Sequence, residues 1–318
     1  MNPHLSSARD IILGIETALA TEIIGQHDLV RKLIITLFAG GHALIEWVPG
    51  LGKTRTVRAL AHILGYDTKR ISFTPDLLPT DLTGTEIYRP QTSKFEVRKW
   101  PIFTSILLAD EINRTPPKVQ SALLEAMEEH QVTIGNETLA LPSPFFVIAT
   151  QNPLEHEGTY PLPEAELDRF FMKIVLTYPR PEDEKAIFRV HSETYEKKPK
   201  SKSPLTGAEL IEMQAYIRES IHIEPKIYDY ISDILEMTRD ASHPYIAYWA
   251  STRAGLALID GARIAALLDD RDYVMPDDIK YLANDILRHR IGLSYEALSK
   301  NISTDMIIED ILGKVRIP

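Results

Sequence analysis

Three observations in the sequence predict an α/β fold: a doubly wound parallel sheet in the N-terminal part, followed by an all-helical C-terminal part. Short apolar runs alternate with helical patterns through the first 180 residues. A glycine-rich turn at residues 49–54 joins one such run to a helix. Beyond Leu205 the apolar residues recur with helical spacing almost throughout. Strands that alternate with helices imply a parallel sheet covered on both faces.

The apolar spacing predicts the elements of the N-terminal part in order. The expected helices span residues 5–20, 27–39, 53–64 and 117–129. The expected strands span residues 42–47, 69–73, 106–109 and 145–150. Residues 74–105 are rich in proline and read as loops with a candidate hairpin at 86–97, and a second hairpin is expected at 132–141.

A change in composition separates the two parts of the chain. Residues 181–204 are polar and punctuated by proline, which is typical of a linker. We therefore expect a nucleotide-binding domain at 1–180, a linker at 181–204 and a helical domain at 205–318. The helices expected in the last domain span residues 207–219, 225–239, 252–268, 276–288 and 303–314.

Charge and composition limit the classes of function. The 318 residues carry a net charge of −10, which argues against a general nucleic-acid-binding surface. The absence of cysteine removes disulfides, thiol nucleophiles and cysteine zinc sites. No apolar run reaches the ~18 residues of a membrane helix, so membrane insertion is not expected. A cytoplasmic protein is the expectation.

The turn at residues 49–54 has the composition of a phosphate-binding loop. Such a loop needs glycines, so that backbone N–H groups surround the phosphates, and it opens into a helix N-terminus. A lysine reaches the terminal phosphates, and the following hydroxyl ligates Mg²⁺. The predicted ATP-binding residues are Pro49, Gly50, Leu51, Gly52, Lys53 and Thr54. Trp47 stands where the usual pattern has its first glycine.

Two neighbouring strands end in polar residues that suit phosphoryl transfer. Asp110 and Glu111 follow the apolar strand at 106–109, and Asn152 follows the strand at 145–150. The first carboxylate would hold Mg²⁺ and the second would polarise the attacking water. An amide at the next strand end could bind the γ-phosphate and that water. Taken alone, the acidic pair could instead cap a helix and Asn152 could be a turn residue.

Long sequence blocks resemble the MoxR family of AAA+ ATPases, which belong to the P-loop NTPases. Those blocks include LLADEINRTPPKVQSALLEAMEEHQVTI (107–134) and FFVIATQNPLEHEGTYPLPEAELDRF (145–170). FTPDLLPTDLTGTEIY (73–88), STRA (251–254) and DILRHRI (285–291) match as well. The resemblance covers nearly the whole chain and implies an AAA+ αβα domain with a helical lid.

The resemblance also implies roles for individual residues. Lys53 and Thr54 would belong to the Walker A motif, Asp110 and Glu111 to Walker B, and Asn152 to sensor 1. Arg169 would be the arginine finger that reaches the neighbouring subunit's nucleotide, and Arg253 the sensor-2 arginine of the lid. Gly25 lies in the segment that resembles the one near the adenine.

The same resemblance implies a ring-forming homo-oligomer, expected to be a hexamer, that couples ATP hydrolysis to the remodelling of a protein partner. A von Willebrand factor A-domain protein is the expected kind of partner.

Other interpretations remain open from the residues themselves. Arg169 could be an ion-pair partner of Glu166 or Asp168, and Arg253 could simply begin a helix. The chain could be a nucleotide-gated scaffold with little turnover, because the Trp47 indole could distort the loop. A DNA-directed AAA+ motor is the third class, although the acidic charge and the lack of a nucleic-acid module weigh against it.

Overall fold

The structure is a computed structural model, which describes residues 3–46, 53–91, 94–152, 158–176, 181–185, 205–240 and 242–318. Its centre is a five-stranded sheet in the order β2-β5-β8-β1-β9, in which all neighbouring strands are parallel. The strands are β1 (Ala43–Glu46), β2 (Thr68–Ser72), β5 (Ile106–Asp110), β8 (Phe146–Gln151) and β9 (Met172–Val175). The predicted parallel sheet is confirmed.

Four of these strands were predicted and β9 was not. β9 is only four residues long and lies at the edge of the sheet beside β1. It contains Lys173, whose ammonium pairs with Glu46 of β1 at 2.6 Å. A short edge strand that carries a charge lacks the continuous apolar run that marks a buried central strand.

Side chains on the two faces of the sheet belong to two separate cores. Ile106, Leu108 and Ile148 point into one core, and Leu107 and Val147 point into the other. This alternation follows from the two-residue period of a strand. The first core also holds the buried faces of α1 (Pro3–Glu22), α2 (His27–Phe38) and α3 (Lys53–Leu64), and the second holds that of α5 (Pro117–Glu129). All four helices were predicted, with ends within a few residues.

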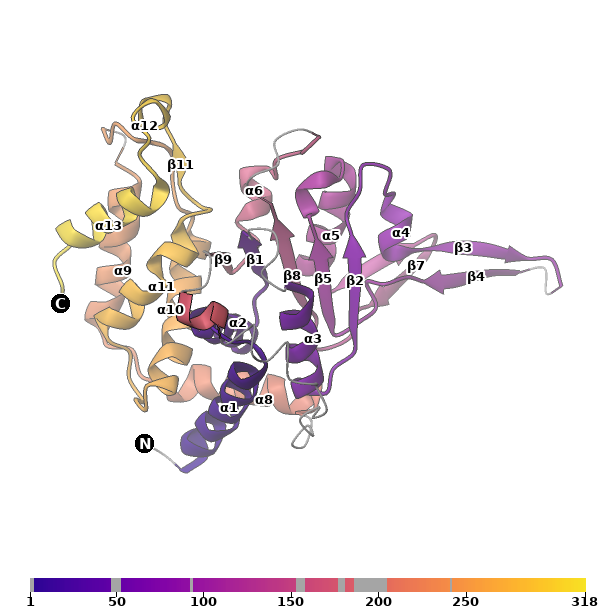
Figure 1. Cartoon of the computed structure of the whole chain (residues 1–318), viewed down its shortest axis with the longest axis horizontal. Coiled ribbons are helices and arrows are strands. Elements are labelled where there is room, and N and C mark those ends of the chain that lie inside the picture. The colour runs from indigo at the N-terminus through magenta and orange to yellow at the C-terminus, as the bar shows by residue number, and fades with distance from the viewer. Residues whose placement is uncertain are drawn as a thin grey trace.

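Two hairpins and two short helices complete the N-terminal domain. Strands β3 (Gly84–Arg89) and β4 (Lys94–Lys99) form an antiparallel arm that projects away from the sheet in Figure 1. Strands β6 (Gln131–Ile134) and β7 (Glu137–Ala140) form the second hairpin. Both hairpins were predicted. The short helices α4 (Pro79–Thr83) and α6 (Glu164–Leu167) were not, because one turn or so leaves no readable periodicity.

The C-terminal part is a helical lid, as predicted. The five expected helices are α8 (Gly207–Ser220), α9 (Pro225–Thr238), α10 (Thr252–Leu268), α11 (Pro276–Leu287) and α13 (Thr304–Lys314). A short helix α12 (Tyr295–Ser299) and the two-stranded pair β10 (Ile246–Tyr248) and β11 (Gly292–Leu293) were not expected. Of the predicted linker, residues 181–185 are helical and residues 186–204 lie outside the described residues.

The lid packs against the N-terminal domain through buried charges as well as apolar contacts. The Lys32 ammonium of α2 lies 2.6 Å from the Asp285 carboxylate of α11. Arg288 also pairs with Asp285 at 2.6 Å and reaches Asp305 of α13 at 2.9 Å. Burial raises the pKa of Asp285, although both cations act in the opposite direction. This paired cluster links α2 and α13 to α11, which lies in the lid beside the N-terminal domain in Figure 1.

In the part of the chain that the structure describes, no helix combines the length and the apolar character needed to cross a bilayer.

A buried histidine ties the start of the sheet to α5. The Nδ1 atom of His42 accepts a hydrogen bond from the Val147 N–H at 3.1 Å. Its Nε2 atom lies 3.3 Å from the Met127 carbonyl oxygen. The first contact requires an unprotonated Nδ1, so the neutral ring donates from Nε2. Burial lowers the pKa of His42 to about 4.

We expect the free energy of unfolding to fall as pH drops from about 6.5 to about 4. In this window the unfolded His42 binds a proton and the folded one does not, because burial lowers its pKa to about 4. The loss between pH 7 and pH 5 should be about 2 kcal/mol from this residue. Urea unfolding of the wild type and of His42→Gln at both pH values measures it. Equal pH dependence in the two proteins would contradict this assignment.

Candidate functional site

The carboxyl ends of the parallel strands bring the predicted residues Asp110, Glu111 and Asn152 to one edge of the sheet. The strand register places Ser72 opposite Asp110, and Glu46 opposite Gln151. The carboxyl end of β1 therefore lies beside that of β8, which Asn152 follows, and α3 begins at Lys53. Ligands bind at this edge in open α/β sheets. The ends of β1, β5 and β8, which flank the predicted Walker and sensor-1 residues, thus lie at one edge.

Most of the predicted phosphate loop lies outside the described residues. Trp47, Pro49, Gly50, Leu51 and Gly52 lie outside the described residues, as do the side chains of Lys53 and Thr54. Their roles stay predictions.

Asp110 ends β5 as a buried carboxylate, to which a hydroxyl and a guanidinium both donate hydrogen bonds. Only 2% of the residue is exposed. The Thr150 hydroxyl donates to its Oδ1 atom at 2.7 Å. The guanidinium of Arg70, on the edge strand β2, donates to Oδ2 at 2.5 Å from Nη2 and 3.2 Å from Nε. A buried charge is tolerated when it is paired and hydrogen-bonded, and Asp110 is both.

Glu111 adopts a left-handed backbone conformation, with φ 60° and ψ 50°. Non-glycine residues rarely adopt this conformation, and it persists where surrounding contacts enforce it. The Glu111 N–H donates to the Thr150 hydroxyl at 3.0 Å, and the Glu111 carboxylate pairs with Arg114 at 3.1 Å. Thr150 therefore holds both acidic residues: it donates to one carboxylate and accepts from the backbone of the other.

The turn after Glu111 is held by a fully buried amide. The short helix η1 (Ile112–Arg114) follows Glu111 directly. The Gln120 side-chain nitrogen lies 3.1 Å from the carbonyl oxygens of Ile112, Thr115 and Tyr160. These contacts join η1 to the segment around Tyr160, which follows Asn152 in the chain. Asn152 itself directly follows β8 and is buried.

The donor chemistry at this edge fits Mg²⁺. Asp110 is a carboxylate at a strand end, and Glu111 stands beside it. Among the described residues, no group of three or more His, Cys, Asp or Glu side chains could hold a metal ion. Mg²⁺ is commonly bound by one or two carboxylates together with phosphates and water, so this sparse set matches it.

The predicted finger and sensor-2 arginines lie together, although they come from different domains. The Arg169 Nη2 atom lies 3.1 Å from one oxygen of Glu128, and the Arg253 Nη2 atom lies 3.0 Å from the other. Glu128 is in the last turn of α5. Arg169 thus pairs with neither Glu166 nor Asp168 in the described residues. Arg253 does stand in the first turn of α10, but it also makes these charged contacts.

A buried ion pair anchors this arginine pair. Asp168 accepts a bond from Arg290 Nε at 2.7 Å, and only 2% of the Arg290 side chain is exposed. Arg290 also donates to the Phe170 carbonyl oxygen at 2.6 Å. The Ser251 hydroxyl donates to Asp168 at 3.0 Å, and Arg253 Nη1 lies 3.4 Å from the same carboxylate. The lid therefore docks on the residue that directly precedes Arg169.

Gly25 lies between α1 and α2 with a positive φ of 75°. A Cβ atom added there would lie 2.6 Å from the Asp183 Cβ atom. Glycine is therefore required both by conformation and by the close approach of the helical residues 181–185. This contact brings the start of the predicted linker to the segment that was expected near the adenine.

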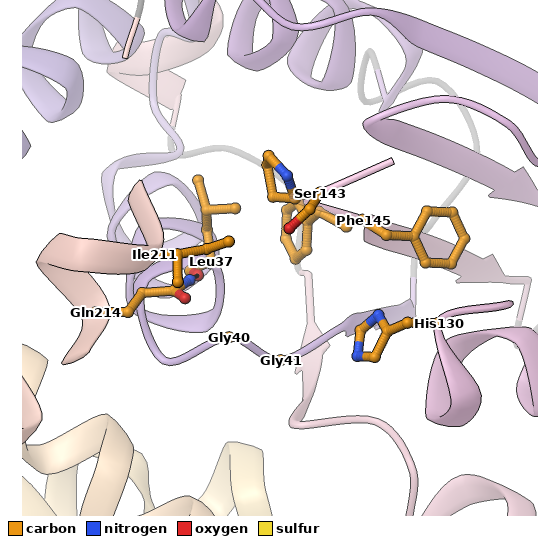
Figure 2. A pocket seen from close by; sticks show the side chains of 10 residues that line it. Leu37, Gly40, Gly41, His130, Ser143, Phe145, Ile211 and Gln214 are labelled. Carbon is orange, nitrogen blue, oxygen red and sulfur yellow. Dashed lines mark hydrogen bonds between the residues drawn. The ribbon is translucent and has the colours of Figure 1, made fainter. Parts of the chain in front are cut away.

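A separate cavity lies at the amino-terminal edge of the sheet. Its volume is about 230 Å³. Figure 2 shows Leu37, Ile211 and Gln214 on one side of it and His130 on the other, with Gly40 and Gly41 between. Among the described residues that line it there is no lysine, arginine or acidic side chain. It therefore lacks the fixed cations that a triphosphate needs, and the opposite edge remains the candidate site.

Comparisons with known proteins agree with this geometry. A family model for the ATPase family associated with various cellular activities (AAA) matches residues 42–172. An AAA lid domain model matches residues 238–311. A protein assigned to the ATPases from Cytophaga hutchinsonii has a crystal structure with a TM-score of 0.90 and 45% identity, covering 99% of this chain and 97% of its own.

Curated relatives match over nearly the whole chain. Chaperone MoxR1 of Mycobacterium tuberculosis is 44% identical over 93% of this chain and 79% of its own length. The uncharacterized protein YeaC of Bacillus subtilis is 46% identical over 93% and 91%. Protein MoxR of Methylorubrum extorquens is 30% identical over 95% and 94%.

The fold and the residues at its sheet edge define an AAA+ P-loop ATPase domain with a helical lid. Within that class, the chain belongs to the MoxR family.

Sequence reasoning missed four residues that shape the site: Arg70, Thr150, Glu128 and Arg290. Thr150 is the last hydroxyl in the strand that precedes Asn152, so the register of this strand with β5 could have suggested it. The other three act through contacts between segments far apart in the chain, and no local pattern marks them.

We expect Thr150→Val to lower ATPase activity and to destabilise the fold by about 1–3 kcal/mol, because it leaves the buried Asp110 carboxylate and the Glu111 N–H without their shared partner. Thr150→Ser keeps the hydroxyl and is the matched control. Urea unfolding and steady-state ATPase rates compare the two. Equal behaviour of the valine and serine variants would show that the hydroxyl does not matter.

Proposed function

We propose that this chain binds ATP with Mg²⁺ at the carboxyl edge of the sheet and hydrolyses it. The observation that carries the proposal is the Thr150 hydroxyl, which holds Asp110 and the left-handed Glu111 side by side at the end of β5. Such fixed polar groups at a sheet edge, next to the N-terminus of α3, suit phosphoryl transfer. Membership of an ATPase family supports the same reaction.

Each residue of the edge would have a separate task. Thr54 and Asp110 would hold Mg²⁺, which supplies charge neutralisation for the phosphates when bound. Lys53 and the backbone of Gly50, Leu51 and Gly52 would bind the phosphates. Glu111 would accept the proton of the attacking water, and its separate contact with Arg114 orients the carboxylate.

We infer that Arg169 and Arg253 act on the same nucleotide. The two guanidiniums contact the two oxygens of the same Glu128 carboxylate, so they lie close to each other. The family resemblance assigns Arg169 to the nucleotide of a neighbouring copy, and Arg253 would then act there too. Two arginines would together offset the charge of the transferred phosphoryl group. Each active site is therefore completed by a second subunit of a homo-oligomer, for which a hexameric ring is the family's expected form.

We further propose a chaperone-like role for the assembly in a cytoplasmic setting. A relative named Chaperone MoxR1 shares 44% identity with this chain. The client would be a protein, and a von Willebrand factor A-domain protein is the kind expected from the family resemblance. ATP turnover would remodel or mature that client.

Glu111→Gln should lower kcat by about a hundredfold or more, because the amide cannot accept a proton from water. ATP binding should persist, since the side chain keeps its shape. A steady-state ATPase assay and fluorescent-nucleotide binding measure the two effects. If both proteins showed the same background rate, hydrolysis would be excluded and the nucleotide-gated scaffold would be the better reading.

Mixing two inactive variants tests whether the arginines act between subunits. Arg169→Ala keeps an intact Glu111, and Glu111→Gln keeps an intact Arg169. Random co-assembly in a head-to-tail ring should restore about a quarter of wild-type turnover. Arg253→Ala mixed with Glu111→Gln should behave alike. Mixtures that stay inactive, although both variants co-assemble by sedimentation, would place the arginine in its own subunit's site.

A further inference from the structure

We propose that Glu128 is a positioning residue, which aligns Arg169 and Arg253 for the phosphate of a neighbouring copy. The inference rests on the proposed function, because it assigns a role to Glu128 only if these arginines serve ATP hydrolysis. Its basis is a single carboxylate whose two oxygens bind two guanidiniums, at 3.1 Å and 3.0 Å, one from each domain.

The backbone that carries Glu128 is well fixed. Glu128 lies in the last turn of α5, between the buried Met127 and the helix end. The Met127 carbonyl contacts the buried His42 ring. His130, two residues after Glu128, ends the helix by donating its N–H to the Ala126 carbonyl. Glu128 therefore projects from a rigid support, which is what a residue that orients others requires.

The charges around Glu128 favour the binding of an anion. Asp168 is already compensated by the buried Arg290. With Arg169, Arg253 and the Glu128 carboxylate added, this ion-pair cluster has three cations and two carboxylates, and therefore one excess positive charge. Without the carboxylate the two guanidiniums would repel each other and separate. The Glu128 carboxylate holds the two guanidiniums together. Because a guanidinium has five N–H donors, each can also bind a phosphate.

The energies involved indicate that Glu128 aligns the two arginines and contributes little to the stability of the fold. The side chains of Glu128, Arg169 and Arg253 are 41%, 30% and 47% exposed. Exposed ion pairs contribute little to stability. Small errors in the position of a catalytic group, in contrast, have large effects on rate. The loss of Glu128 should therefore affect turnover far more than folding.

Glu128→Gln keeps the size of the side chain and removes its charge. We expect kcat at saturating ATP to fall about tenfold, with KM changed by less than about twofold. The melting temperature and the ATP-dependent assembly in sedimentation should equal those of the wild type. Glu129→Gln is the matched control, because Glu129 is the exposed neighbour in the same helix turn, and it should keep wild-type kcat.

Epistasis with the arginines separates positioning from other roles. In an Arg169→Ala/Arg253→Ala background, Glu128→Gln should leave the residual rate, measured as single turnover at high enzyme concentration, unchanged, because there is nothing left to align. A further tenfold loss in that background would overturn the proposal, and so would a Glu128→Gln enzyme with wild-type or higher kcat. If instead Arg169→Ala and Arg253→Ala both kept full turnover, the proposed role of the arginines would fail, and the role of Glu128 would fail with it.

Discussion

The parallel register of the central sheet is the constraint from which the site follows. Because all five strands point the same way, their polar ends meet at one edge. The same register brings Thr150 of β8 beside the end of β5. A buried carboxylate such as Asp110 needs hydrogen-bond donors, and the adjacent strands supply them from Thr150 on one side and Arg70 on the other.

The ion pairs around Arg169 and Arg253 are of two kinds: a fixed pair that docks the lid, and exposed pairs that can exchange partners. Arg290 and Asp168 form a largely buried pair, and the same arginine binds backbone carbonyl oxygens, so breaking it would leave a buried charge uncompensated. Glu128 and its two arginines are partly exposed, and such pairs yield readily to a stronger anion. The anchor keeps the lid in place while the exchangeable contacts remain open to a phosphate.

An element could be predicted from the sequence when the contacts that form it lie between neighbouring residues of the chain. The helix that begins at Thr252 was predicted from its apolar spacing, and its start has a local cause, since the Ser251 hydroxyl accepts from the Arg253 N–H. Asp110 and Glu111 were predicted because an apolar strand ends directly at them. β9 and the small β10–β11 pair escaped because their strands have at most four residues and exist only through pairing partners.

Glu128 illustrates why the rest of the site could not be read from the chain. In the sequence it is one of two adjacent glutamates at the end of a helix, where an exposed, solvated acid is the ordinary expectation. What distinguishes it from Glu129 is direction: the helix presents Glu128 toward α6 and the first turn of α10, where Arg169 and Arg253 converge. That convergence requires the lid to be docked through Asp168, Ser251 and Arg290. The role of one glutamate thus depends on contacts between segments up to 125 residues apart, which only the folded chain brings together.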